Sequence, residues 1–143
     1  MSAYRQLLVA IDLGEQSRAV AEKSAELARL WQAKLQLLHV IEFVPVEPMS
    51  DALVPVVQID DRLIARAGEQ LQALAVAVGL EASSCRVATG SVKGELLRHA
   101  RDCGADLIVL GCRERHGLSI LVNFTEDTVL HGAPCDVLAL RVR

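Results

Sequence analysis

The stretch Leu7-Leu8-Val9-Ala10-Ile11-Asp12 decides the fold, because an unbroken apolar run ends at a single carboxylate. A run without polar alternation leaves no face for water, so it predicts a strand buried on both sides. Strands of that kind are typical of parallel sheets that carry helices on both faces. The sequence therefore predicts an α/β protein whose central strand is residues 7–11.

The rest of the chain alternates between short apolar runs and amphipathic stretches, which predicts repeated βαβ units. The further strands are predicted at residues 35–40, 84–88, 107–110 (ending at Gly111) and 136–142. The helices are predicted at residues 17–31, from Asp60 or Asp61 to Val78, from the Gly90–Gly94 turn to Cys103, and at roughly 120–131. We expect Ser17 to cap the first helix, and Leu63 to begin the buried stripe of the second.

The 143 residues contain no linker or internal repeat, so we expect one domain over residues 1–143. Connections in such folds are right-handed. We expect an open parallel sheet of five strands in the order 3-2-1-4-5, with helices on both faces. In such a sheet the ligand crevice lies at the carboxyl ends of the strands, where the strand order reverses. Asp12, Val40 and Gly111 are therefore the candidate site residues.

Composition excludes several classes of function. The formal charge is −3, and one Trp, one Tyr and two Phe offer no stacking platform, which argues against nucleic-acid binding. No apolar run reaches the about 20 residues that span a bilayer, and the N-terminus shows no signal-peptide pattern. We therefore expect a cytoplasmic protein that binds neither nucleic acid nor membrane.

The chain lacks the motifs of the common catalytic and metal sites. The turn after Asp12 has no G-x-G-x-x-G, and no phosphate loop of the G-x-x-x-x-G-K-[ST] type occurs. The four histidines lack metal-ligand spacing, and His39 is expected to be a satisfied, half-buried side chain. We expect no catalytic residue and no metal, while Asp12 retains two interpretations, a local structural acceptor or a ligand contact.

The four cysteines form no CxxC pair or zinc spacing, so we expect reduced thiols that serve as small packing residues. They are Cys85, Cys103, Cys112 and Cys135. Cys112 follows a predicted strand end, which makes it the candidate for redox activity.

The last predicted strand is apolar almost to the C-terminus, although the topology places it at an edge. An uncovered apolar edge invites pairing with another strand. Two copies pairing antiparallel about a two-fold axis would bury both edges and give a homodimer. The alternative is that Arg141 and Arg143 simply blunt the edge. The predicted dimer edge consists of Val137, Leu138, Ala139, Leu140 and Arg141.

Four stretches in this order resemble the universal stress protein family over essentially the whole chain. They are Val9-Ala10-Ile11-Asp12, Leu37-Leu38-His39-Val40, Ala105-Asp106-Leu107-Ile108-Val109-Leu110-Gly111 and Ala133-Pro134-Cys135-Asp136-Val137-Leu138. The resemblance implies an adenine-nucleotide α-hydrolase-like fold and dimer formation through the last strand.

Nucleotide-binding members of that family carry G-x-x-G-x9-G-[ST] after the fourth strand, where glycine backbone and a hydroxyl wrap the phosphates of ATP. Here Gly111 and Thr125 fit the pattern, whereas Glu114 and Phe124 replace its second and third glycines. A carboxylate and an aromatic ring both oppose close approach to an anion. The chain thus resembles the A-type subgroup, which is not expected to bind ATP.

We therefore expect a homodimeric stress-response binding module with no cofactor, acting through an unidentified regulatory protein partner. A first alternative is an ATP- or AMP-binding regulator that uses Asp12, Val40, Gly111 and Thr125. Asp12 and Val40 match the family's adenine- and ribose-side positions. A second alternative is a slow ATPase or autokinase.

Overall fold

The computed structural model describes residues 3–42, 61–113 and 129–142. Residues 129–132 are helical and are the described part of the last predicted helix. The remaining elements, in chain order, are β1 (Gln6–Ala10), α1 (Ser17–Trp31), β2 (Lys34–Glu42), α2 (Asp61–Ala77), the short 3-10 helix η1 (Ala82–Ser84), β3 (Cys85–Gly90), α3 (Val92–Cys103), β4 (Leu107–Arg113) and β5 (Asp136–Val142).

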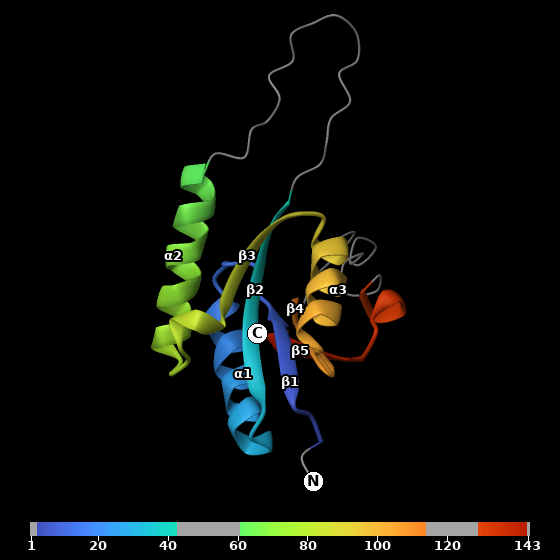
Figure 1. The fold of residues 1–143 in the computed structure, drawn as a ribbon. Coiled ribbons are helices and arrows are strands. Elements are labelled where there is room, and N and C mark those ends of the chain that lie inside the picture. The colour runs from blue at the N-terminus through green and yellow to red at the C-terminus, as the bar shows by residue number, and fades with distance from the viewer. Residues whose placement is uncertain (1–2, 43–60, 114–128, 143) are drawn as a thin grey trace, which may run out of the picture.

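The strands form one parallel sheet of five strands in the order β3-β2-β1-β4-β5, which confirms the predicted topology. Figure 1 shows α1 and α2 on one face of this sheet and α3 on the other. Helices thus cover both faces, as the right-handed crossovers require. Among the described helices, none has the length and hydropathy to cross a bilayer.

β1 lies at the centre of the sheet and supplies both hydrophobic cores. Leu7 and Val9 belong to the cluster under α1 and α2, whereas Leu8 belongs to the cluster under α3. All three side chains are fully buried. Because successive side chains of a strand point to opposite faces, an apolar run without polar breaks is what a strand covered on both sides needs.

The predicted helix starts need two corrections. Ser17 does not cap α1: Gln16 holds the cap position without a side-chain cap bond, and Ser17 is the first helical residue. Leu63 does not begin a buried stripe, because it is 48% exposed and burial in α2 starts one turn later, at Ala67. The first turn of α2 stands clear of the core, so the helical period alone placed Leu63 one turn too early.

The carboxyl end of β4 also differs from the prediction. The strand does not end before Gly111 but continues through it to Arg113, pairing with β5 along its whole length. A glycine weakens a strand but does not end one when a partner strand continues beside it. The predicted boundary was wrong because the polar residues after Gly111 indicated a loop, whereas pairing with β5 keeps the segment to Arg113 in the sheet.

Asp106 joins the beginnings of β1 and β4. Its carboxylate accepts hydrogen bonds from the backbone N–H groups of Arg5 at 2.8 Å and Gln6 at 3.0 Å. Its own N–H donates to the carbonyl of Gln6 at 3.0 Å. These bonds fix the register with which β4 enters the sheet beside β1.

Replacing Asp106 with Ala removes both charge-assisted acceptors, so we expect Asp106→Ala to lower the free energy of unfolding by about 2 kcal/mol. Urea titration followed by circular dichroism measures the change. Asp102→Ala is the matched control, because Asp102 is an exposed carboxylate of α3 that reaches only Arg98, at 3.5 Å. It should cost less than about 0.5 kcal/mol, and equal losses in the two variants would contradict the role of Asp106.

Candidate functional site

Three of the predicted site residues meet at the carboxyl edge of the central strands. The register pairs Val9 with Leu37 of β2 and with Val109 of β4. Counting onward along these parallel strands places Asp12 level with Val40 and close to Gly111. The structure therefore brings together Asp12, Val40 and Gly111, as the strand order predicts.

Asp12 organises the turn between β1 and α1. Its Oδ1 accepts hydrogen bonds from the N–H of Gly14 and from the hydroxyl of Ser17, both at 2.8 Å. Within that turn Leu13 adopts a left-handed conformation with φ of 61°, which costs a non-glycine residue about 1–2 kcal/mol. Asp12 therefore stabilises a strained turn, which is the structural role left open by the sequence.

His39 links the carboxyl ends of β1 and β2. Its Nδ1 lies 2.7 Å from the carbonyl oxygen of Ile11. Because a carbonyl oxygen can only accept, Nδ1 carries the proton in this contact. The side chain is half-buried and its Nδ1 has a partner, as expected, and the contact ties β2 to the residue that follows β1.

Gly111 sits inside the sheet rather than in a loop. It pairs with Leu140, and the next two residues, Cys112 and Arg113, pair with Arg141 and Val142. The backbone that follows Gly111 is therefore committed to the strand ladder for two more residues.

The other positions of the family's phosphate pattern, Glu114, Phe124 and Thr125, lie outside the described residues.

The glycine-rich stretch before α3 is a strand-to-helix turn. Gly90 has φ of 138°, a conformation that suits glycine, and Ser91 caps α3 by accepting from the N–H of Gly94 at 3.0 Å. The predicted turn is confirmed, and the helix starts at Val92, between the two glycines that were expected to bracket its entry.

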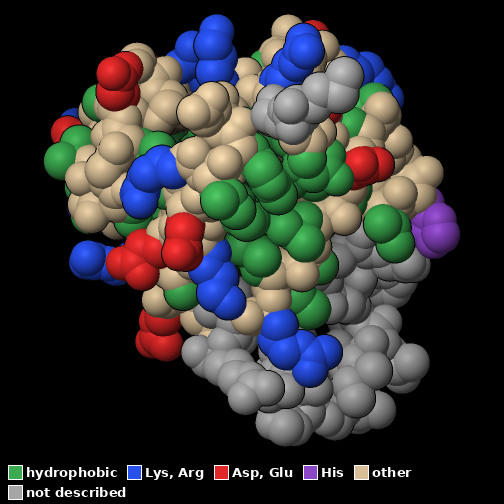
Figure 2. All heavy atoms as spheres, turned by 90° about the horizontal axis from the view of Figure 1, so that it is seen from below, with side chains coloured by type: hydrophobic (Ala, Val, Ile, Leu, Met, Phe, Trp, Pro, Cys, Tyr) green, Lys and Arg blue, Asp and Glu red, His purple; other side chains and the backbone are tan. Residues whose placement is uncertain are grey.

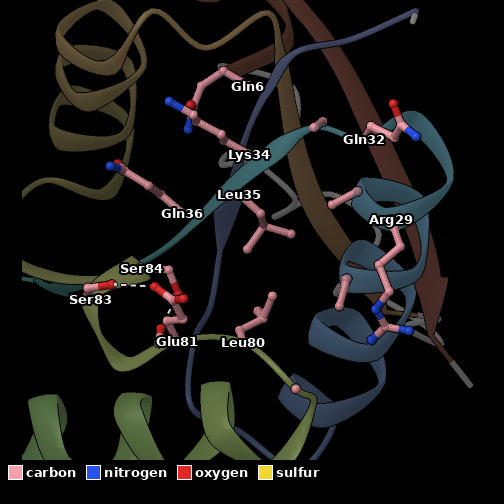
Figure 3. A pocket seen from close by; sticks show the side chains of 14 residues that line it. Gln6, Arg29, Gln32, Lys34, Leu35, Gln36, Leu80, Glu81, Ser83 and Ser84 are labelled. Atoms are coloured by element: carbon pink, nitrogen blue, oxygen red, sulfur yellow. Dashed lines mark hydrogen bonds between the residues drawn. The ribbon is translucent and has the colours of Figure 1, made fainter.

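A groove of about 640 Å³ lies at the other end of the sheet, where β1 and β2 begin. Figure 3 shows Leu35 and Leu80 at its centre, with Arg29 and Lys34 among the polar side chains around them. Arg29 is already engaged, since it donates to the carbonyl of Val78 at 3.2 Å and ties α1 to the end of α2.

Figure 2 views the molecule from this end. Hydrophobic side chains gather at its centre, flanked by Lys and Arg. This groove lies at the opposite end of the strands from Asp12, whereas open α/β sheets bind ligands at the Asp12 end.

The cysteines and acids do not form a metal centre in the described parts of the chain, where no group of three or more potential ligands occurs. The four thiols are free and half-buried. Burial raises the pKa of Cys85, Cys103 and Cys135 above its ordinary value. These three are therefore protonated at neutral pH, which agrees with the expected packing role.

Comparison with known proteins decides the family. The model of the universal stress protein family matches residues 3–141. This chain belongs to that family. Universal stress protein A homolog 2 of Coxiella burnetii is 33% identical to it over 144 residues, which cover 100% of this chain and 99% of the relative.

Two solved structures share the fold at low sequence identity. A universal stress protein in complex with cAMP has a TM-score of 0.71 at 19% identity and covers 98% of both chains. The universal stress protein from Archaeoglobus fulgidus in complex with dAMP has a TM-score of 0.60 at 19% identity, covering 97% of this chain and 98% of that one. With the strand order, the similarity confirms the adenine-nucleotide α-hydrolase-like α/β fold.

Sequence reasoning missed two contacts, one next to Asp12 and one at the opposite end of the sheet, where β1 and β4 begin. The contact between His39 and Ile11 gives no sequence signal beyond a histidine in an apolar strand. The clamp made by Asp106 has a faint one, an aspartate directly before a buried strand, because such a carboxylate can accept from the exposed N–H groups where a neighbouring strand begins.

Asp12→Ala should destabilise the fold by about 1 kcal/mol, because the N–H of Gly14 and the hydroxyl of Ser17 lose their acceptor. Asp12→Asn keeps one side-chain oxygen and should lose less than half of that. Urea unfolding of both variants measures the difference, with the exposed Glu15→Ala as the control in the same turn. Wild-type stability in Asp12→Ala would show that the carboxylate does not hold the turn.

Proposed function

We propose that this chain is a cytoplasmic, homodimeric binding module of stress physiology that does not grip the triphosphate of ATP. Two copies pair through the outer edge of β5, and the dimer acts on a regulatory protein partner rather than on a chemical substrate. This proposal rests on β5, an apolar strand that pairs with β4 on one side and with no described strand on the other.

β5 pairs with β4 from Leu107 opposite Asp136 to Arg113 opposite Val142. No other described strand lies along its second side. Leu138 and Leu140 pack against the cluster under α1, and yet both remain only half-buried. An apolar edge of this kind is a hazard unless it is covered.

Antiparallel pairing of two β5 strands would satisfy the outward N–H and C=O groups of both copies at once. It would also extend the half-buried leucines of each copy toward those of the other. This supports a second copy of the chain as the strand that covers the edge.

Two features argue against a tight grip on phosphate: the backbone conformation at Gly111 and the residue types that follow it. The ladder with β5 holds residues 111–113 extended, so their N–H groups are not gathered around an anion. Glu114 adds a negative charge, and Phe124 adds bulk, at positions where the family pattern has glycine.

A second candidate function is binding of an adenine nucleotide with a single phosphate at Asp12, Val40, Gly111 and Thr125. Two similar proteins are complexes with cAMP and dAMP, and each of these ligands carries one phosphate group. Such a ligand needs the nucleoside half of the crevice and little of the phosphate pattern. The third possibility, a slow ATPase or autokinase, requires the triphosphate grip that this chain's residue types oppose.

Light scattering tests the dimer. The wild-type chain should be a dimer at micromolar concentration, and Ala139→Lys should be a monomer, because it places two like charges in the paired edge. Ala139 is exposed in the single chain, so its replacement spares the core. Thr89→Lys, at an exposed position of the opposite edge strand β3, is the matched control and should remain a dimer. A monomeric wild type, or a dimeric Ala139→Lys, refutes pairing through β5.

Isothermal titration with Mg-ATP should give no saturable heat in the micromolar range. Titration with AMP separates the two candidates, because saturable binding of AMP without ATP hydrolysis supports the second one. Val40→Glu should then abolish AMP binding by placing a second carboxylate beside Asp12. Micromolar affinity for ATP would contradict the first proposal, and hydrolysis above the buffer rate would point to an enzyme.

A further inference from the structure

Two of the free cysteines lie at one corner of the molecule. Cys103 is the last residue of α3, and Cys135 directly precedes β5. Both are half-buried, and both pack against the hydrophobic cluster that contains Leu8, Ala100 and Ile108. The other two thiols, of Cys85 and Cys112, do not belong to this cluster.

The local backbone explains why the two residues converge. α3 ends at Gly104, whose φ of 66° turns the chain, and the N–H of Ala105 closes the turn on Ala100 at 2.9 Å. The chain then enters β4 at Leu107, which lies opposite Asp136 in the parallel ladder. Cys135 directly precedes this pair on one strand and Asp106 precedes it on the other, so the two lie side by side. Asp106 in turn follows Cys103 by three positions in the sequence.

The electrostatics of the two thiols agree with this placement. Burial is the main cause that raises the pKa of each thiol. The charge of Cys103 is one of the smaller causes that raise the pKa of Cys135, after burial and the carboxylates of Asp136 and Asp106. Both thiols are therefore protonated at neutral pH.

We propose that Cys103 and Cys135 form a redox pair that closes to an intramolecular disulfide when the chain meets a disulfide oxidant such as oxidised glutathione. This inference does not depend on the proposed function. It assigns a modification site to the corner between α3 and β5, which the crevice at the other end of the strands does not use.

The reaction has two balanced steps. One protein thiol loses its proton, and its thiolate attacks the S–S bond of oxidised glutathione, forming a mixed disulfide and releasing one glutathione thiolate, which takes up a proton. The second protein thiolate then attacks the protein sulfur of the mixed disulfide and releases the second glutathione. Two protein thiols are oxidised, and one oxidised glutathione is reduced to two molecules of glutathione.

The bond would tie the end of α3 to the start of β5. A disulfide needs Cα atoms about 4.4–6.8 Å apart. Cys103 ends a helix and precedes a glycine turn, so the bond would form at a point where the chain already leaves its helix. Closure would constrain the entry of β5 into the sheet while leaving the ladder between β4 and β5 intact.

The test exposes the reduced, full-length chain to excess oxidised glutathione without oxygen, then alkylates it with N-ethylmaleimide and determines intact and peptide masses. We expect two of the four thiols to escape alkylation, no retained glutathione, and a cross-linked peptide pair joining Cys103 to Cys135. The initial rate should rise about tenfold per pH unit below the thiol pKa. Four alkylated thiols, or a bond between other cysteines, would overturn the proposal.

Variants separate pairing from general reactivity. Cys103→Ser and Cys135→Ser should each lose the cross-link and keep glutathione on the remaining member of the pair. Cys85→Ser is the matched control, since it removes a half-buried thiol with a raised pKa from another part of the sheet and should still form the bond. The cross-link is read directly in the wild-type chain, so a variant that fails to fold does not decide the outcome. Loss of the cross-link in folded Cys85→Ser would overturn the proposed pairing of Cys103 with Cys135.

Discussion

Complete burial of β1 between two neighbouring strands and two helical layers is the constraint on which the rest of this structure depends. Leu7, Leu8 and Val9 are fully buried, and they serve two separate cores. Truncating a buried leucine to alanine costs about 2–5 kcal/mol in proteins generally. β2 and β4 flank β1 on its two sides, so this buried strand marks the centre of the sheet and the place where the strand order reverses.

The helix packing follows from that burial. α1 approaches the sheet through small side chains, Ala21, Ala25 and Ala28, which bring the helix close to β1 and β4. On the other face, Leu96 and Leu97 of α3 fill the space over Leu8. Small side chains under one helix and leucines under another thus fill the two cores on either side of β1.

Much of this arrangement could be predicted from the sequence, because it rests on patterns that burial imposes directly. The continuous run at residues 7–11 predicts the central strand, and the alternation of runs and stripes predicts a parallel sheet covered by helices. The features that were not predicted from the sequence share another cause. The strand character of Gly111, the bond from Ser17 to Asp12 and the exposure of Leu63 depend on what lies alongside each residue in space, which local composition does not encode. The clamp of Asp106 was missed for the same reason, since its partners lie about a hundred positions away along the chain.

In the proposed dimer, a second copy of this chain covers the outer side of β5. Amide hydrogen exchange tests this pairing, because alternate residues of β5 direct their N–H groups away from β4. If the dimer forms, these outward amides exchange slowly at high protein concentration and faster on dilution, while the amides bonded to β4 stay protected throughout. Rapid exchange of the outward amides at every concentration would contradict it.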